Sequence, residues 1–421
     1  MSLREATCAF CGLLCDDLEV EVAGGVLRVV RGGCARSEAA FAALGEPAAP
    51  PPRIAGQAAT LDAAVAAAAD VLRAARRPLI GGLDVDVNGM RSTLALARRI
   101  GAVVDHADGA AKYRNLHVLQ EFGGITTTFA EARNRADLVV LVGDGWSRRF
   151  PRFLERIVAP GASGAATAAR RIVTVTAIDP ATRMALPKGA EVLALDAPLV
   201  GLPAVCTMLQ ALVEGRPVQP ARLAGVSQEA LVRCAEWIRA ARYGVVVWSA
   251  ADLDWPHAEL TVQAIARLVR TLNGSTRFAA LPLAGTDGDL TANAVQTWQS
   301  GVPLPASYAN GSVDFDPNRY ALRDVLARGE ADALVWVSSL SGAVPPPASG
   351  VPTIALTRAD VRLGMAPSVQ IPVATPGIDA SGHLLRSDKV ITLRLPRLRE
   401  NGLPSASTVL DALLGQLEQR C

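Results

Sequence analysis

Four of the seven cysteines lie near the start of the chain, as Cys8, Cys11, Cys15 and Cys34. Their spacing is C-x2-C-x3-C-x18-C. Three closely spaced thiolates and a distant fourth can surround a cubane iron–sulfur cluster, and Gly12 allows the backbone to turn close to a metal. The same pattern also fits a structural zinc site or a knot of buried free thiols.

A β-hairpin is expected between the third and the fourth cysteine. Residues 18–22 and 26–30 have the alternation of strands, and Gly24-Gly25 between them favours a tight turn. A hairpin reverses the chain, so Cys34 would return to the first three cysteines. All four are therefore predicted to meet as ligands of one metal site.

The composition indicates a globular protein without a polyanionic partner. Hydrophobic residues make up 50% of the 421 residues, and the formal net charge is +2. No apolar run approaches the ~20 residues of a membrane span, and the first residues lack a signal peptide's apolar segment. Cys206, Cys234 and Cys421 form no secreted-type disulfide framework. We expect a cytoplasmic protein of ~2–3 domains that binds neither membrane nor nucleic acid.

After a Pro- and Gly-containing linker at 45–56, strands alternate with helices. A helix at 61–75, a strand at 78–83, a helix at 90–100 and a strand at 102–105 form the βαβ unit of a parallel sheet. Further helices are predicted at 115–121, 130–134, 204–213, 227–239, 257–272, 320–327 and 408–417, and further strands at 138–143, 171–178, 244–248, 278–283, 332–337, 353–356, 369–373 and 389–395.

Two similar segments each introduce a buried strand. Residues 135–142 (RADLVVLV) and 330–337 (EADALVWV) both place Ala-Asp before an apolar run, at about the same distance after a strand–helix unit. They suggest an internal duplication that gave two related α/β domains. The alternative is that Ala-Asp followed by apolar residues is a common way to begin a buried strand.

These patterns divide the chain into four consecutive parts. We expect a cysteine-rich hairpin domain at 1–52, a first α/β domain at 53–225, a second at 226–350 and a C-terminal β-rich segment at 351–421. The last part contains a Gly-x-x-x-Arg-x-Asp sequence at 382–388. The predicted fold class is α/β with parallel sheets.

The cysteine hairpin, the two α/β domains and the 382–388 sequence together resemble the molybdopterin oxidoreductases. The similarity is closer to the B-type subunit of formylmethanofuran dehydrogenase, and it covers essentially the whole chain. It is carried by residues 8–17, Leu119-Gln120 with Gly123, 131–140, Pro151-Arg152, 296–303 (QTWQSGVP) and 377–388. Methylotrophic bacteria have a relative of this protein in the formyltransferase/hydrolase complex. That complex moves a formyl group from tetrahydromethanopterin to methylofuran and releases formate, the end of formaldehyde oxidation.

The first departure from the family concerns its metal ligand. Redox members place a cysteine or selenocysteine just before the helix that bears the Leu-Gln pair, and this residue ligates molybdenum or tungsten. Residues 108–120 contain no cysteine, although a metal held by dithiolenes favours a soft thiolate or selenolate. Asp108 is an alternative oxygen ligand, whereas Lys112, Tyr113 and Arg114 are typical of residues that fill a vacated cavity.

Two further departures face the pterin in the family. The dinucleotide-contacting loop, Gly-x-Asn-Pro in the family, is Gly143-Asp144-Gly145-Trp146 here, and an indole is bulky where a pyrophosphate needs the backbone. His383 stands where the family usually has Thr. The resemblance with these three changes implies that the molybdenum or tungsten bis-pterin cofactor is absent.

The four histidines offer no catalytic arrangement. His117 is expected on a helix as a packed or partly exposed side chain, and His106 with Asp108 lacks a third metal ligand nearby. His257 belongs to the start of a helix, and His383 to the closing segment. We therefore predict no catalytic residue in this chain.

The resemblance implies a non-redox scaffold subunit whose own active site is lost. The implied partners are an amidohydrolase-like A-type subunit that hydrolyses formyl-methylofuran, a β-helix-like C-type subunit, and a formyltransferase. The rival interpretation is a working dehydrogenase subunit with a bis-pterin metal and a [4Fe-4S] relay, which the cysteine quartet favours. A stand-alone pterin-binding protein is a third alternative.

Overall fold

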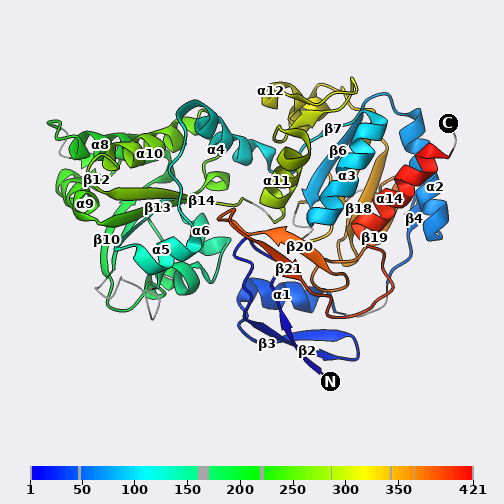
Figure 1. Cartoon of the computed structure of the whole chain (residues 1–421), viewed down its shortest axis with the longest axis horizontal. Coiled ribbons are helices and arrows are strands. Elements are labelled where there is room, and N and C mark those ends of the chain that lie inside the picture. Colours follow the sequence, from blue (N-terminus) through cyan, green and yellow to red (C-terminus); the bar gives the residue numbers. More distant parts are fainter. Residues whose placement is uncertain are drawn as a thin grey trace. The chain divides into compact units, whose positions relative to one another are not determined.

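The computed structural model describes residues 2–45, 49–159, 170–218, 222–285, 287–341, 344–364 and 366–419. The chain forms two compact units (Figure 1). Unit 1 comprises Met1–Gly109, Thr286–Arg386 and Ile391–Cys421, and unit 2 comprises Ala110–Gly285 and Ser387–Val390. Each unit contains a sheet of mainly parallel strands with helices packed on it, so the predicted α/β class is confirmed.

The sheet of unit 1 is parallel at its centre. Strands β7 (Val103–Val104), β6 (Pro78–Asp84), β17 (Ala333–Ser338), β18 (Thr353–Arg358) and β19 (Val369–Val373) lie side by side in that order. β6, β17 and β18 are buried along their whole length, as expected of strands covered on both faces. Short antiparallel strands flank this core: β15 (Ala306–Ser307), β16 (Asp314–Phe315), β4 (Arg53–Ile54) and β5 (Gln57–Ala58).

Helices cover both faces of this sheet. α2 (Leu61–Ala74), α3 (Val87–Ile100), α11 (Asp289–Ser300) and α14 (Ala406–Glu418) share one hydrophobic core with one face. α13 (Leu322–Ala327) packs on the other face, and the short α12 (Pro317–Tyr320) precedes it. A Cβ at Gly81 would lie 2.2 Å from Leu322 Cδ1, so glycine at this position leaves room for the leucine of α13 against β6.

The sheet of unit 2 is parallel throughout. Its order is β10 (Glu191–Ala197), β9 (Arg171–Thr176), β8 (Leu138–Leu141), β13 (Tyr243–Ser249) and β14 (Arg277–Leu283). The central strand β8 is fully buried. β10 was not predicted; it is an edge strand in which only Leu195 and Ala197 are buried.

Three long helices of unit 2 cover one face of that sheet, namely α8 (Leu202–Val213), α9 (Gln228–Ala240) and α10 (Glu259–Leu272) (Figure 1). α5 (Phe129–Arg135) lies on the opposite side in Figure 1. The remaining elements are α4 (Gly109–Phe122), α6 (Gly145–Arg148), α7 (Pro180–Met184), a π-helical turn (Leu154–Val158), two 3-10 turns (Leu199–Gly201 and Ala250–Asp252) and the hairpin of β11 (Arg222–Leu223) and β12 (Val226–Ser227). No helix within the described residues is both long and apolar enough to span a membrane.

The predicted cysteine hairpin is confirmed. β2 (Leu18–Ala23) pairs antiparallel with β3 (Val26–Arg31), and Gly24 and Gly25 adopt φ of 58° and 85° in the turn. β1 (Ser2–Ala6), which was not predicted, adds a third strand, and α1 (Ala35–Ala43) follows Cys34. Another antiparallel pair, β20 (Gly382–Leu385) and β21 (Thr392–Leu395), lies in the C-terminal part.

The division of the chain into consecutive domains differs from the structure. β6, β17 and β18 pair directly in one sheet, although they come from the predicted parts 53–225, 226–350 and 351–421. Residues 226–285 belong to unit 2 rather than to a separate second domain, and residues 1–52 belong to unit 1. Strand pairing is decided by backbone hydrogen bonds between distant segments, which local patterns do not reveal. Residues 46–48 of the predicted linker lie outside the described residues.

The repeated Ala-Asp segments have the same structural role in the two units. Asp137 precedes β8, and its carboxylate accepts the backbone N–H groups of Arg242 and Tyr243, both at 2.9 Å. Asp332 precedes β17, and its carboxylate accepts the N–H groups of Arg76 and Arg77 at 2.8 and 2.9 Å.

The strand registers that follow these two carboxylates also match. Leu138 pairs with Gly244, and Ala333 pairs with Pro78, so each Asp fixes the start of the parallel strand beside its own. This shared geometry fits an internal duplication, and it also explains physically why Ala-Asp would precede a buried strand.

Replacing either aspartate should loosen one unit. Asp137→Ala and Asp332→Ala each remove two charge-assisted hydrogen bonds, which should lower the free energy of unfolding by about 1–3 kcal/mol. Hydrogen exchange should show faster exchange at Arg242 and Tyr243 in the first variant. The second variant should show it at Arg76 and Arg77.

The control for these variants is Asp411→Ala on the exposed side of α14, which should change stability by less than about 0.5 kcal/mol. Unchanged exchange at both strand starts in Asp137→Ala and Asp332→Ala would show that these carboxylates do not hold the neighbouring strands.

Candidate functional site

The four cysteines are gathered beside the β2–β3 hairpin. Cys8, Cys11 and Cys15 are buried, and Cys34, which is half-buried, precedes α1. The backbone N–H of Cys8 donates to the carbonyl of Cys15 at 2.8 Å, which closes the first three cysteines into a compact loop. Leu14 in this loop has a positive φ of 47°.

Gly32 brings Cys34 to the other cysteines. It has φ of +71°, and a Cβ there would lie 2.2 Å from the carbonyl oxygen of Asp17, two residues after Cys15. Burial raises the pKa of the Cys8 thiol well above its ordinary value, and nearby Cys11, Cys15 and Cys34 raise it further. The four thiols therefore lie within electrostatic reach of one another, as the hairpin predicted.

The geometry of the four cysteines does not by itself form a metal site. In the described parts of the chain, no three or more His, Cys, Asp or Glu side chains are arranged to hold a metal ion. Burial raises the pKa of Cys11 to about 12, and a metal would have to displace such thiol protons on binding. The assignment of Cys8, Cys11, Cys15 and Cys34 to a metal therefore stays a prediction, and no chemical step is derived from it.

In this fold class, ligands commonly bind at the topological switch point of a parallel sheet. This point lies outside the carboxyl ends of two neighbouring strands whose onward connections lead in opposite directions. In unit 1 this switch point lies between β6 and β17, because β7 is the outer neighbour of β6 and β18 the outer neighbour of β17. Asp84 ends β6, and its Oδ2 accepts hydrogen bonds from the N–H and the hydroxyl of Ser341, which follows β17, both at 3.0 Å.

A buried ion pair lies close to this point in unit 1. Asp287 pairs with Arg36 of α1 at 2.6 Å, and its side chain is 4% exposed. Burial raises the pKa of Asp287 to about 6, Arg36 opposes this shift, and Asp84 adds to it. Since the charge of Asp287 also acts on Cys11, the pair connects the cysteine cluster to the carboxyl edge of the sheet.

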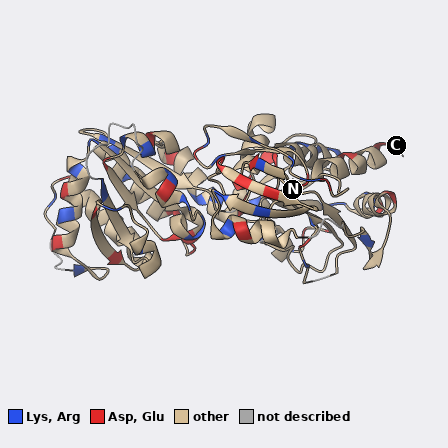
Figure 2. Ribbon diagram, turned by 90° about the horizontal axis from the view of Figure 1, so that it is seen from below, with Lys and Arg blue, Asp and Glu red and all other residues tan. Residues whose placement is uncertain are grey.

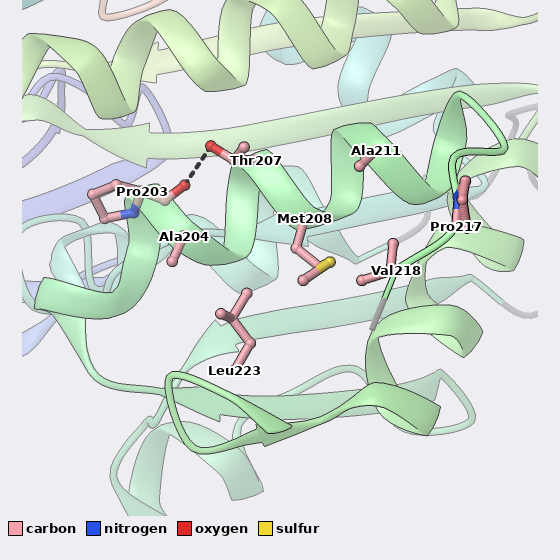
Figure 3. Close-up of a pocket in the computed structure, with 8 residues that line it drawn as sticks. All are labelled: Pro203, Ala204, Thr207, Met208, Ala211, Pro217, Val218 and Leu223. Atoms are coloured by element: carbon pink, nitrogen blue, oxygen red, sulfur yellow. Dashed lines mark hydrogen bonds between the residues drawn. The ribbon is translucent and has the colours of Figure 1, made fainter. Parts of the chain in front are cut away.

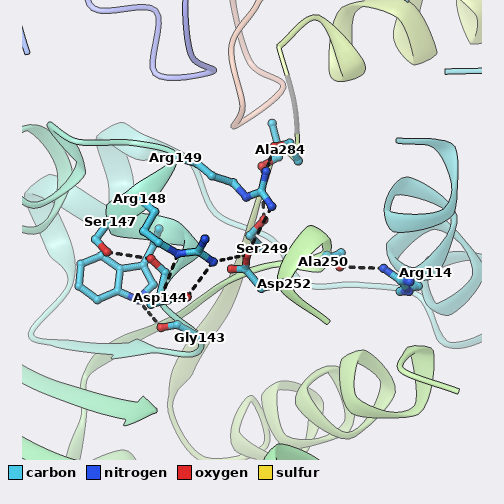
Figure 4. Close-up of polar contacts among 12 residues, drawn as sticks. Arg114, Gly143, Asp144, Ser147, Arg148, Arg149, Ser249, Ala250, Asp252 and Ala284 are labelled. Carbon is cyan, nitrogen blue, oxygen red and sulfur yellow. Dashed lines mark hydrogen bonds and ion pairs between the residues drawn. The ribbon is translucent and has the colours of Figure 1, made fainter. Parts of the chain in front are cut away.

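In unit 2 the switch point lies between β8 and β13, whose outer neighbours are β9 and β14. Figure 4 shows the side chains that follow these strands. Arg148 pairs with Asp144 at 2.9 Å and with Asp252 at 3.1 Å, and Arg149 lies 3.5 Å from Asp252. Arg149 also donates to the carbonyl of Gly285 at 2.9 Å.

Asp252 is seated directly against the loop that follows β8. Its side chain is 2% exposed, and a Cβ at Gly145 would lie 1.8 Å from its Oδ2. Burial raises the pKa of Asp252, whereas Arg149, Arg148 and a hydrogen bond from the Gly145 backbone oppose that shift. A carboxylate of the protein itself therefore lies directly against the loop that follows β8.

Trp146 differs from the expectation. Its indole was expected to block the approach of a pyrophosphate, but it is fully buried, and its Nε1 donates to the carbonyl of Gly143 at 2.7 Å. Gly143, with φ of +76°, turns the chain so that the indole folds under its own loop. The group that fills the loop is Asp252, which the sequence analysis did not single out.

Two residues of α4, Arg114 and His117, make polar contacts within the described chain. Arg114 donates to the carbonyl of Ala250 at 3.1 Å and pairs with Asp254 at 2.7 Å (Figure 4). His117 lies 2.8 Å from Glu121 on the same helix, which agrees with a partly exposed side chain.

Asp105 and His106 form a second buried polar group, at the end of β7. Asp105 accepts the N–H groups of His106 and Leu322, both at 2.8 Å, and burial raises its pKa to about 7. The N–H of Asp108 donates to His106 Nδ1 at 3.0 Å, so the His106–Asp108 spacing serves a local turn.

The other two histidines are exposed. His257 has φ of +61° just before α10, and His383 lies on β20 opposite Arg394.

The acidic residues of the switch points could have been found from the sequence. Asp84 directly follows a predicted buried strand, and Asp252 comes soon after another. The carboxyl ends of parallel strands lie at one edge of the sheet, so polar residues that follow different strands can lie close together there. The sequence alone does not show that two such strands are neighbours.

A groove of about 570 Å³ lies on unit 2 along α8 (Figure 3). Its lining is mainly apolar and holds no titratable side chain: Pro203, Ala204, Thr207, Met208, Ala211, Pro217, Val218 and Leu223. It therefore offers a contact surface and no catalytic group.

Comparisons with known proteins point to one group of relatives. The chain is 31% identical over 334 residues to the B-type subunit of the formyltransferase/hydrolase complex Fhc from Methylorubrum extorquens, covering 78% of this chain and 86% of that protein. It is 24% identical over 401 residues to the B-type subunit of the tungsten-containing formylmethanofuran dehydrogenase 2 of Methanocaldococcus jannaschii, covering 92% of each. No protein-family model matches the chain.

A solved structure points to the same group of relatives. A chain of the FhcABCD complex from Methylorubrum extorquens, crystallised with methylofuran, is similar with a TM-score of 0.74 and 28% identity, covering 88% of this chain and 99% of that chain. Acetylene hydratase from Pelobacter acetylenicus has a TM-score of 0.64 at 11% identity, covering 99% of this chain and 70% of that chain, which shows a shared fold alone.

Gly145→Ala should destabilise unit 2. The added Cβ would displace the carboxylate of Asp252, so we expect a loss of about 1–3 kcal/mol in the free energy of unfolding. The matched control is Gly415→Ala in α14, where a Cβ meets nothing within 4 Å and should stabilise the helix by about 0.5–1 kcal/mol. Denaturant unfolding measures both, and equal stability of Gly145→Ala and the unchanged protein would mean that Asp252 is not seated on the loop.

Asp105 should make the stability of unit 1 depend on pH. Its pKa is raised from 3.8 to about 7, so folding retains a proton that the unfolded chain releases. This contribution is fully present below about pH 4 and is lost as the pH rises through about 7.

The comparison that isolates this effect is Asp105→Asn, which cannot titrate. The free energy of unfolding of the unchanged protein, relative to that variant, should fall by up to about 4 kcal/mol between pH 4 and 7 and then stay level. Urea unfolding at four pH values measures this difference, and a difference that does not vary with pH would contradict the assigned pKa.

Proposed function

This chain belongs to the family that contains the B-type subunits of the formyltransferase/hydrolase complex and of formylmethanofuran dehydrogenase, and from that premise we propose that it is the B-type subunit of a formyltransferase/hydrolase complex. In this role it is a non-redox scaffold in the oxidation of formaldehyde to formate through tetrahydromethanopterin and methylofuran. Its fold is a degenerate molybdopterin-oxidoreductase-like architecture, which the similarity to acetylene hydratase supports at the level of the fold.

The observation that carries the proposal is the occupied switch point of unit 2. Arg148 and Arg149, which follow β8 in the chain, are paired with Asp144 and Asp252. A pyrophosphate entering here would have to displace Asp252, which already lies against Gly145. The residues present therefore do not fit the dinucleotide arm of a pterin cofactor.

The sequence adds a second argument against a molybdenum or tungsten centre. No cysteine occurs in residues 108–120, where the redox members of the family place their thiolate or selenolate ligand. Asp108 is the oxygen ligand that could replace it, but a soft metal in a dithiolene cage favours sulfur or selenium. We derive no reaction step through such a metal, and we assign no catalytic residue to this chain.

The cysteine quartet keeps a separate role in the proposal. Cys8, Cys11, Cys15 and Cys34 are the candidate ligands of a [4Fe-4S] cluster, supported by their spacing and by their gathering at one end of the hairpin. A cluster bound there would tie the loop to α1 and so stabilise the start of the chain.

The proposed partners are the other subunits of the complex. They are an amidohydrolase-like A-type subunit, a C-type subunit and a formyltransferase in the same assembly, and these subunits would supply the chemistry. The similarity to a chain of the FhcABCD complex, which was crystallised with methylofuran, supports this assembly. The present chain would contribute docking surfaces and enclosure for the formylated carrier.

The test is the metal and pterin content of the assembled complex, purified anaerobically. We expect no molybdenum, tungsten or pterin, together with formyltransferase and hydrolase activity in the presence of this chain. About one tungsten or molybdenum atom per chain would instead establish the rival function, a redox-active formylmethanofuran dehydrogenase subunit, for which the tungsten-containing relatives are the specific support.

The cysteine assignment has its own test. If the quartet binds a cluster, iron and a broad absorption shoulder in the blue should be present in the complex and lost in Cys8→Ser and Cys15→Ser. Cys206→Ser is the matched control, since Cys206 is an equally buried free cysteine in the core of unit 2. Zinc in place of iron, or neither metal, would exclude the iron–sulfur interpretation.

A further inference from the structure

The surface of unit 1 carries an exposed tryptophan on an otherwise well-packed helix. Trp298 of α11 is 61% exposed, although this helix buries residues such as Leu290, Val295 and Gln296. Single exposed apolar residues are common on proteins. Tryptophan is different, because exposing an indole is costly and because it is enriched among the residues that dominate binding at protein interfaces.

The turn that presents Trp298 is rigidly held. Gln296 is fully buried, accepts a hydrogen bond from Tyr308 Oη at 2.8 Å and donates to Ser300 Oγ at 2.9 Å. Gly301, in the left-handed conformation, ends the helix one residue after Ser300. An indole fixed on such a turn loses little conformational entropy on binding, which favours an anchor role.

Within α3 and α11 themselves, the exposed charged side chains are basic. Arg98 of the adjacent helix α3 donates to Gln299 through both terminal nitrogens, at 3.2 and 3.3 Å, and its guanidinium lies 5.6 Å from the Tyr308 ring. Arg91, also exposed, lies on the same helix. α3 contains no Asp or Glu, and the one acidic residue of α11, Asp289, is 5% exposed.

This basic surface contrasts with the rest of the chain. Acidic and basic residues are interspersed over both units in Figure 2. On the β2–β3 hairpin, for example, Glu21 pairs with Arg28 and Glu19 with Arg31. The exposed side of α3 and α11 instead combines arginines with an indole and presents no carboxylate of its own.

We propose that the exposed side of α3 and α11 is a docking surface for a partner protein that offers an apolar pocket for Trp298 and carboxylates for Arg98 and Arg91. The inference rests on the proposed function, because it assigns a surface to the assembly. A second copy of this chain is a poorer occupant, since a two-fold symmetric contact would bring the same arginines together. A heterologous acidic partner gives the complementary charge.

The experiment uses the full chain, expressed with and without the other subunits of the complex. The affinity of the purified chain for the preassembled remaining subunits is measured for the unchanged protein and for Trp298→Ala and Arg98→Glu. We expect Trp298→Ala to lower the affinity at least tenfold. Arg98→Glu should lower it as well and weaken its dependence on salt.

Met184→Ala is the matched control, because this methionine is 81% exposed but lies on α7 of unit 2. It should change the affinity less than twofold. Circular dichroism should be unchanged in all three variants, and the melting temperature should be unchanged in Trp298→Ala and Met184→Ala, since neither of these side chains is buried. Arg98→Glu also removes the contacts to Gln299 and Tyr308, so a small fall in its melting temperature is expected. The emission of Trp298 is obtained by subtracting the spectrum of Trp298→Phe from that of the unchanged chain. Its maximum should shift to shorter wavelength when the partners bind, because the indole leaves water.

Binding of Trp298→Ala and Arg98→Glu within twofold of the unchanged chain would overturn this surface while leaving the proposed function intact. Loss of a homodimer in Trp298→Ala, with partner binding unchanged, would also overturn it. Failure of the unchanged chain to bind the other subunits at all would instead overturn the proposed function.

Discussion

The buried guanidinium of Arg399 holds the cysteine-rich start of the chain to its C-terminal segment. It pairs with Asp379 at 2.8 Å, and the two side chains are 4% and 2% exposed. Its other nitrogens donate to the carbonyls of Gly25, Leu44 and Gly45 at 2.8 to 3.1 Å. One side chain thus provides hydrogen-bond donors for backbone carbonyls at the tip of the hairpin and at the end of α1. A buried charge is tolerated only with such complete pairing, so this contact joins the hairpin and the end of α1 to the C-terminal segment.

The same use of internal charges recurs at both switch points. Asp84 and Ser341 close the one in unit 1, and Asp252 with Arg148 and Arg149 closes the one in unit 2. In each case these charged or polar groups at the strand ends form pairs within the chain. Releasing them would leave buried charges unpaired, which is costly. This arrangement favours a stable framework over a binding site, and it agrees with a scaffold role in a larger assembly.

A scaffold has to present surfaces as well as hold its own shape. The groove along α8 and the basic side of α3 and α11 are on different units, and each is built on a helix whose opposite side belongs to a large hydrophobic core. Rigid helices with one side in a core are suitable platforms for partner contacts. Under the proposed function, the residues of this chain that matter most for the assembly would lie on its surface.

Much of this protein was determined by local sequence. Gly24-Gly25 fixed the hairpin turn, alternation and apolar runs located most strands and helices, and the Ala-Asp segments marked β8 and β17, because each of these features depends on residues within a few positions. The tertiary structure alone decided which strands are neighbours, since β6, β17 and β18 come from distant parts of the chain. It also placed Asp252 against Gly145, folded Trp146 under its loop and left Trp298 in solvent. These outcomes depend on which segments meet in space, and no spacing along the sequence encodes that.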